Sequence, residues 1–400
     1  MLVLNIIQII ILTLLGLATL YILVFSIASL LYKQKKYVDN GNIKKIAVLI
    51  PGYKEDGVIL DVANIALQQD YPSDRYDVVI IADSFQQETL NTLKTLPIQL
   101  IEVSFDKSTK SKALNKAMAT LEREYDIAVV LDADNVMETD FLKKINAAFE
   151  YDIIAVQGHR TAKNTNNSWA VLDAISEEIN NNIFRKGHRV LGLSSAIIGS
   201  GMAFRYNYFK TLMSTVTAVG GFDKEIELKM LKEGRKIVYL DDALVYDEKI
   251  QKSEVFGNQR RRWLSAQLHY FKKDIVSAFK NLILKGNIDY FDKAIQFIQP
   301  PRILLLGAVM LCSFCFILTN YFLDNPVPLT NYWVLLAVAC VLSFVFSVPK
   351  SFYNLKTLNA LARLPKGMLM MLLSLLKIKG ANKTFIHTQH TSNSEEINSK

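Results

Sequence analysis

A long uncharged segment lies near the N-terminus of this chain. Residues 2–32 carry no charged side chain and are rich in Ile and Leu. This length exceeds the ~20 residues that an α-helix needs to cross ~30 Å of hydrocarbon. A cleaved signal peptide would place basic residues before a short apolar core, whereas the first basic residue here is Lys33. We therefore predict an N-terminal transmembrane helix over residues 1–32.

Apolar segments also occur in the last quarter of the sequence. Two of them predict transmembrane helices at about residues 303–320 and 332–348, joined through a polar turn at residues 320–331. Residues 290–298 and 368–376 are apolar but too short to span, and basic residues flank them, so we predict interfacial helices there. Half of all residues are hydrophobic, which exceeds the usual content of a soluble enzyme.

Basic residues predict the orientation of these spans. Lys33, Lys35 and Lys36 follow the first span, Lys350, Lys356 and Arg363 follow the third, and the turn between the second and third contains none. Since basic residues concentrate on the cytoplasmic side, we expect a multi-pass plasma (inner) membrane protein. Its N-terminus would be outside, and residues 33–300 and the C-terminus would be cytoplasmic.

Charge and cysteine content limit the partners. The net charge of +8 suits an anionic membrane surface, but the basic residues form no stripe typical of nucleic-acid binding. All three cysteines lie inside predicted spans, and the pair Cys312 and Cys315 has no His or acidic neighbours there, so packing is favoured over metal binding. We expect membrane lipids, and no nucleic acid, among the partners.

Residues 45–160 alternate short apolar strands with amphipathic helices. This pattern is typical of an α/β fold with a largely parallel sheet that helices cover on both faces. We predict strands at residues 46–49, 77–81, 99–103, 127–131 and 153–156, and helices at residues 58–69, 89–96, 112–122 and 141–149. In such sheets ligands bind beyond the carboxyl ends of the strands, so the residues that follow the strands are candidates for a site.

Acidic residues follow three of these strands. Glu55 and Asp83 follow the first two, and Asp132 and Asp134 follow the strand at 127–131. Two carboxylates one residue apart can bind a divalent cation, Mg²⁺ or Mn²⁺, that bridges a nucleotide diphosphate. Such a cation neutralises the charge that develops as a diphosphate leaves. A solvated turn is the alternative, but the position directly after an apolar strand favours metal binding.

Beyond residue 160 the strand and helix rhythm loosens. Residues 168–184 predict a helix with one polar face. The small residues Gly199, Ser200 and Gly201 allow close approach of the backbone to a ligand, and a tight structural turn is an equal alternative. Asp223 is a natural N-cap of a following helix, which is its simplest structural role.

Residues 259–263 read Gln-Arg-Arg-Arg-Trp. One interpretation is a basic patch that faces a membrane surface. The amide and the indole beside the arginines favour instead a pocket that binds an anion and stacks a sugar or a base.

Together these segments resemble the family 2 glycosyltransferases of the GT-A fold, in the membrane-bound branch that contains cellulose, hyaluronan and poly-N-acetylglucosamine synthases. The resemblance covers residues 45 to about 270 in order. It implies a cytoplasmic GT-A domain over residues 33–285 with a mostly parallel sheet. The interfacial helices, two transmembrane helices and a polar tail would then occupy residues 286–400.

The resemblance also implies roles for particular residues. Pro51, Tyr53 and Glu55 match the first nucleotide-binding segment, Asp83 matches the acidic residue that contacts uridine, and the stretch at 110–115 resembles K-x-x-A-L-N with Lys112 near the donor. Asp132 and Asp134 match the metal motif, with Asp132 also beside the donor. Gly199, Ser200 and Gly201 resemble the acceptor-side loop. Gln259, Arg262 and Trp263 match Q-x-x-R-W, which implies an arginine on the diphosphate and a tryptophan beside the acceptor sugar.

One position departs from the family pattern. The family usually has a T-E-D triplet whose aspartate is the catalytic base, and the register here places Glu225 at that aspartate. Glu is a competent base with one more methylene. The sequence therefore favours Glu225 as the base, with Asp223 as the rival.

The implied activity is inverting transfer of a hexosyl or N-acetylhexosaminyl group from a nucleotide-sugar, UDP-linked by the resemblance. The acceptor would be a glycan or a lipid-linked molecule in surface or exopolysaccharide synthesis, and the cofactor a divalent metal. The alternative is a non-catalytic nucleotide-binding membrane protein that retains the fold.

Overall fold

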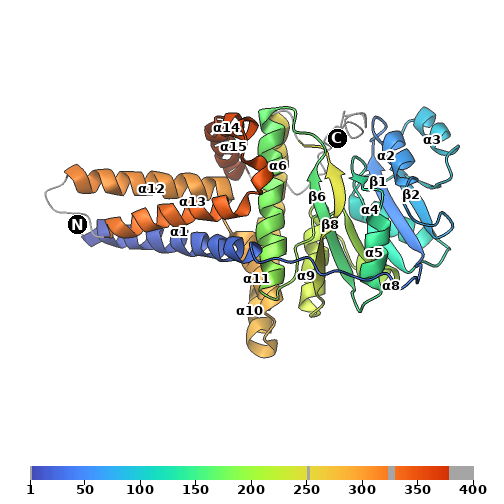
Figure 1. Cartoon of the computed structure of the whole chain (residues 1–400), viewed down its shortest axis with the longest axis horizontal. Helices are drawn as coiled ribbons and strands as arrows, with labels where there is room; N and C mark the ends of the chain where they lie inside the picture. The colour runs from blue at the N-terminus through green and yellow to red at the C-terminus, as the bar shows by residue number, and fades with distance from the viewer. Residues whose placement is uncertain (1, 250–252, 323–328, 378–400) are drawn as a thin grey trace.

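A computed structural model describes residues 2–249, 253–322 and 329–377 of the 400-residue chain. In this part of the chain, eight strands form one sheet in the order β3-β2-β1-β4-β7-β6-β8-β5 (Figure 1). The strands are β1 (Ile46–Tyr53), β2 (Tyr76–Asp83), β3 (Gln99–Val103), β4 (Ile127–Val130), β5 (Val136–Met137), β6 (Ala155–Ala162), β7 (Met202–Arg205) and β8 (Ile237–Asp247).

The five strands that the sequence predicts are all present. β1 pairs in parallel with β2 and β4, β2 with β3, and β6 with β8, so the α/β fold with a mostly parallel sheet is confirmed. β7 lies antiparallel between β4 and β6, and β5 lies antiparallel to β8. The sequence pattern did not indicate β5, β7 and β8. β5 and β7 are short, and β8 carries Asp241 and Asp242 within its apolar pattern.

Helices cover both faces of the sheet. The buried side chains of α4 (Lys110–Thr120), α8 (Tyr206–Ser214) and α9 (Phe222–Lys232) form one core with one face. Those of α2 (Ile59–Ala66), α3 (Gln87–Leu93) and α5 (Phe141–Phe149) pack on the other face. Burial on both sides explains why the central strands are continuous runs of Ile, Val and Ala.

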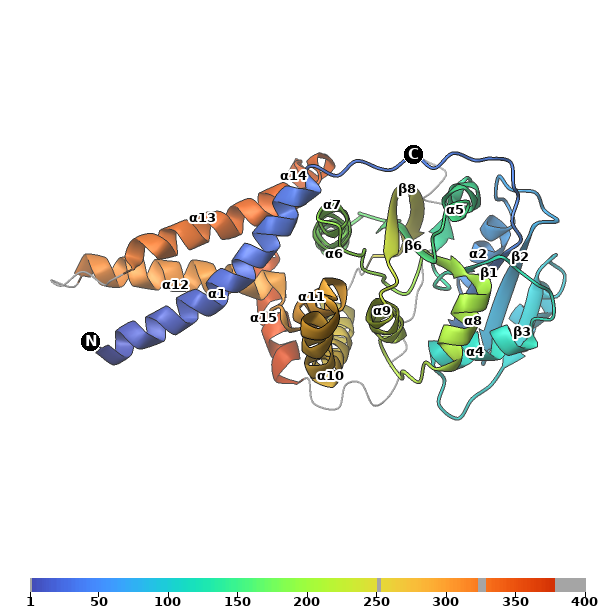
Figure 2. The same ribbon diagram turned by 90° about the horizontal axis from the view of Figure 1, so that it is seen from below.

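α6 (Ser168–Asn181) lies between the sheet and a bundle of apolar helices (Figures 1 and 2). It continues through the π-helical turn η1 (Asn182–Gly187) into α7 (His188–Val190). At Gly187 the helices touch closely, because a Cβ there would lie 2.2 Å from the carbonyl oxygen of Phe25 in α1.

Three helices are long and apolar enough to cross a membrane: α1 (Leu2–Ser29), α12 (Arg302–Phe322) and α13 (Thr330–Ser347). They lie side by side and project away from the sheet (Figures 1 and 2). Most of their side chains face outward, and an apolar surface of this size is unfavourable in water. These helices coincide with the three predicted spans.

The remaining helices connect the bundle to the sheet domain. They are α10 (Ser253–Lys285), α11 (Ile288–Ile298), α14 (Leu355–Leu361), α15 (Leu364–Leu376) and the 3-10 turn η2 (Lys350–Phe352). α11 and α15 coincide with the segments predicted as interfacial helices. Most of the predicted 320–331 turn (residues 323–328) and the polar tail (residues 378–400) lie outside the described residues.

Candidate active site

A cavity of about 840 Å³ lies at the carboxyl ends of β1, β2 and β4. The start of α4, the loop at residues 196–199 and the start of α9 form further walls. α6 and α10 close the side that faces the apolar bundle. This is the edge at which parallel sheets of this kind bind ligands, so it agrees with the edge that the strand pattern indicates.

The turns after β1 and β2 form one end of this cavity. Pro51, Tyr53, Glu55 and Asp83 all line it, and Glu55 and Asp83 are buried. Tyr53 and Asp83 are paired in the sheet register, which places the two turns side by side. The Ser84 hydroxyl donates a hydrogen bond of 2.9 Å to Asp83 Oδ1 and holds that carboxylate in place. The arrangement suits recognition of a polar ring such as a base.

Asp132 and Asp134 follow β4 and line the cavity. Among the described residues, no three side chains of the types His, Cys, Asp and Glu gather as a metal site. Two carboxylates fit Mg²⁺ or Mn²⁺ when the other ligands are diphosphate oxygens and water. The pair can therefore hold a cation jointly with a diphosphate ligand.

Lys110 lines the cavity beside the Asp132 turn, and it was not selected from the sequence. Its ammonium binds Asp132 Oδ1 and donates a hydrogen bond of 2.8 Å to the carbonyl oxygen of Gly199. Lys112 is exposed, is absent from the cavity wall, and donates to the carbonyl oxygen of Lys107 at 2.9 Å. The K-x-x-A-L-N pattern begins with Lys110, so the signal that identifies this residue was available.

The small-residue segment contributes Gly199 to the cavity wall, but not Ser200 or Gly201. Ser200 is buried, and its hydroxyl accepts a hydrogen bond of 2.9 Å from the backbone N–H of Asp132 and donates to Asn135. Gly201 has a φ of 62°, and a Cβ there would lie 3.1 Å from Val245. Ser200 thus holds the Asp132 turn, and Gly201 packs against Val245, which agrees with the structural alternative for this segment.

Asp223 and Glu225 lie on different sides of α9. Asp223 lines the cavity, whereas Glu225 is buried outside its wall and forms an ion pair of 2.9 Å with Lys229. Two residues along an α-helix are separated by about 200° around its axis, so both cannot face one ligand. On geometry, Asp223 is the better base candidate, contrary to the preference that the sequence register indicates.

Glu227 also lines the cavity and was not selected from the sequence. It forms an ion pair of 2.7 Å with Lys293 of α11, and both side chains are buried. Burial raises the pKa of Glu227, and the Lys293 ammonium opposes that shift. The pair ties α9 to α11.

Gln259, Arg262 and Trp263 all line the cavity from α10. Their spacing of three and four residues places them on one helix face. Burial lowers the pKa of the Arg262 guanidinium, and the nearby carboxylates of Asp132 and Asp223 oppose that shift. Arg260 lies over the Trp263 ring at 4.6 Å and forms an ion pair of 2.5 Å with Asp173 of α6.

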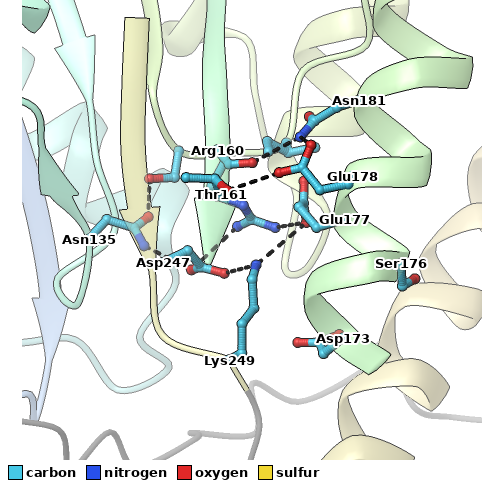
Figure 3. A network of polar contacts seen from close by, with 12 residues as sticks. Asn135, Arg160, Thr161, Asp173, Ser176, Glu177, Glu178, Asn181, Asp247 and Lys249 are labelled. Carbon is cyan, nitrogen blue, oxygen red and sulfur yellow. Dashed lines mark hydrogen bonds and ion pairs between the residues drawn. The ribbon is translucent and has the colours of Figure 1, made fainter. Parts of the chain in front are cut away.

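A buried network of ionic side chains joins the cavity to α6 (Figure 3). We call Arg160, Glu177, Arg185, Asp247 and Lys249 the Arg160 network. Arg160 pairs with Glu177 at 2.8 Å, and Lys249 pairs with Asp247 at 2.7 Å. Burial by itself would raise the pKa of Glu177, but Arg160 and Lys249 hold it well below its usual range. This network was not predicted from the sequence, in which the polar face of the helix at 168–184 was the available signal.

The model of a sequence family described as glycosyltransferase like family 2 matches residues 44–266, more than half of the chain. This chain belongs to the family 2 glycosyltransferases. The match ends inside α10, just after Trp263, so it covers the sheet domain and the cavity residues on α10.

Two curated relatives agree with this family. A probable glycosyltransferase from Bacillus subtilis, YdaM, is 23% identical over 255 residues, which cover 60% of this chain and 59% of the relative. An N-acetylglucosaminyltransferase from Rhizobium meliloti is 24% identical over 327 residues, 76% of this chain and 71% of the relative. The glycosyltransferase thus spans only about 59% of the length of YdaM.

The fold of the glycosyltransferase has a solved counterpart. The mannosyltransferase PcManGT from Pyrobaculum calidifontis, in complex with GDP-Man and Mn²⁺, matches with a TM-score of 0.59 at 17% sequence identity. The match covers 94% of this chain and 98% of that one. The predicted family and GT-A fold are confirmed.

Proposed function

We propose that this glycosyltransferase moves a hexosyl or N-acetylhexosaminyl group from a UDP-linked sugar to a glycan or lipid-linked acceptor, with inversion at the anomeric carbon. Surface or exopolysaccharide synthesis is the process that we propose for it. The observation that carries the proposal is that one cavity brings together Asp83, Asp132, Asp223 and Arg262. A nucleotide-binding end, cationic groups for a diphosphate and a carboxylate base are the components that transfer requires.

The comparisons support the donor class and the metal. The Rhizobium meliloti relative is named an N-acetylglucosaminyltransferase, and PcManGT was solved with a nucleotide-sugar and Mn²⁺. For this chain we propose Asp132 and Asp134 as the residues that hold Mg²⁺ or Mn²⁺. When bound, the cation would neutralise charge on the leaving diphosphate.

The protein's own groups then divide the work. Tyr53, Glu55 and Asp83 bind the nucleoside, while Lys110 and Arg262 face the diphosphate and stabilise the charge that grows on it as the sugar leaves. Asp223 accepts the proton of the acceptor hydroxyl as that oxygen attacks the anomeric carbon. We place Trp263 beneath the acceptor sugar, since its indole lines the same wall as Gln259 and Arg262.

The apolar helices support a location at the membrane. We propose that α1, α12 and α13 span the plasma membrane, with the N-terminus outside and the sheet domain and C-terminus in the cytoplasm. The basic residues after the first and third spans support this orientation. A cytoplasmic cavity would have direct access to soluble nucleotide-sugars.

The test is transfer by the purified full chain in neutral detergent with Mn²⁺. A panel of labelled UDP- and GDP-sugars is offered with extracted membrane lipids and oligosaccharides, and products are identified by mass spectrometry. We expect one UDP-sugar to be transferred, and Asp134→Ala to remove transfer while the protein stays folded. Nucleotide binding without transfer or hydrolysis of any donor would support the non-catalytic alternative instead.

A further inference from the structure

α6 separates the cavity from the apolar bundle, and its two faces differ in kind. Val171, Ile175 and Ile179 pack into a core with side chains of α1, α12 and α13. The opposite face directs Asp173, Ser176, Glu177 and Asn180 into the cavity wall. The end of the cavity away from the strands therefore lies at the base of the proposed membrane helices.

Arg302 is the first residue of α12 and lies just outside the cavity wall, beside two residues that line this end of the cavity. Its Nη2 donates to the carbonyl oxygen of Ser176 at 3.1 Å, and its guanidinium lies 5.8 Å from the centre of the Phe184 ring. Ser176 and Phe184 both line the cavity. Arg302 is thus located where the polar cavity meets the start of an apolar helix.

Arg302 lacks the ion pair with a carboxylate that the nearby buried arginines form. Arg160 and Arg185 pair with Glu177, and Arg260 pairs with Asp173. Among the described side chains, no carboxylate lies within 4 Å of Arg302, and its buried Nη1 has no hydrogen-bond partner. A largely buried cation without a close counter-ion is unfavourable, and an unsatisfied buried donor can be satisfied by a water, an ion or a ligand.

The geometry points to a phosphate-bearing lipid as the acceptor, and we propose that Arg302 binds its phosphate. This inference rests on the proposed function and names the acceptor class. A guanidinium binds phosphate through two parallel N–H bonds, which would satisfy Nη1 and supply the missing anion. The acyl or prenyl chain would lie along α12 among the apolar helices, while the headgroup would reach the cavity past Ser176.

The experiment measures lipid binding by the full chain in neutral detergent, without any donor. The probes are dioleoyl phosphatidate and dioleoylglycerol, which differ only in the phosphate. We expect the phosphatidate to bind on the order of tenfold more tightly. Arg302→Gln should abolish that preference, and Arg302→Lys should retain part of it. The control is Arg363→Gln, which removes an exposed charge between α14 and α15 and should leave the preference unchanged.

Inorganic phosphate distinguishes a lipid site from a free phosphate site. If phosphate binds at Arg302 but neither lipid is preferred, the lipid part of the proposal is wrong. Equal binding of the two lipids, or equal losses in Arg302→Gln and Arg363→Gln, would overturn it entirely. Since no donor is present, these results stand whether or not transfer is observed, and an active enzyme with no phosphate preference would leave the proposed function intact.

Discussion

At the scale of single residues, the start of α9 places the two candidate bases in different surroundings. Asp223 faces the cavity, and Glu225 is held by Lys229 outside its wall. We predict that Asp223→Asn lowers turnover by ~10²–10⁴ while the Kd of the donor stays within twofold, because only the proton acceptor is lost. Steady-state kinetics and donor titration provide the measurement. Glu225→Gln is the control and should lower turnover much less. If Glu225→Gln lost more turnover than Asp223→Asn, Glu225 would be the base, as the sequence register favours.

Lys110 and Lys112 offer a second matched pair. Lys110 contacts Asp132 in the cavity, whereas Lys112 is exposed and bonds to a backbone carbonyl. Lys110→Ala should lower kcat/KM for the donor by ~10², because a cationic group beside the diphosphate is removed. Lys112→Ala should remain within twofold of wild type. Equal losses in the two variants would show that the ammonium in the cavity has no special role.

At the scale of secondary-structure elements, buried charged side chains connect β6 and β8 to α6. His159 of β6 hydrogen-bonds to Asp241 of β8 at 2.9 Å and to Glu178 of α6 at 3.1 Å. Burial lowers the pKa of His159, but the hydrogen bonds and charges of Asp241 and Glu178 outweigh burial and raise it from 6.5 to about 9. The folded protein therefore holds this proton to a higher pH than the unfolded chain.

This difference predicts how stability depends on pH. Because the folded pKa is the higher one, the stabilisation by His159 is complete below about pH 6.5 and is lost as the pH rises through about 9. The loss is roughly 3 kcal/mol or less. The unfolding temperature in neutral detergent should fall between pH 7 and 9.5, and His159→Gln should flatten that change. An identical pH profile for the variant would contradict the assignment.

At the scale of the whole molecule, the proposed orientation can be tested by labelling. The three cysteines are first replaced by serine, and one new cysteine is then introduced. Asn331→Cys places it at the start of α13, and Lys107→Cys places it in the sheet domain. Intact cells are treated with an impermeant thiol reagent. We expect Asn331→Cys to react and Lys107→Cys to react only after lysis, because basic residues flank the sheet-domain side of the spans. Reaction of Lys107→Cys in intact cells would contradict the proposed orientation and place the sheet domain outside.

Local patterns in the sequence were sufficient for the elements and for much of the cavity. Uninterrupted apolar runs predicted α1, α12 and α13, and short apolar strands followed by acidic residues predicted the edge of the sheet that carries Asp83 and Asp132. These signals are local because burial of one segment requires a continuous or periodic apolar pattern within that segment. The Q-x-x-R-W motif likewise selected Gln259, Arg262 and Trp263, and all three line the cavity.

Tertiary structure alone decided which polar side chains meet. Asp223 rather than Glu225 faces the cavity, because the packing of α9 on the sheet sets the rotation of that helix. Arg160 and Lys249 share the carboxylates of Glu177 and Asp247 (Figure 3). Ser176 accepts a hydrogen bond from Arg302, which lies far from it in the sequence. Whether a charged side chain finds a counter-ion is decided only when the segments pack together. Coulomb interactions depend on distance and burial and not on the order of residues in the chain.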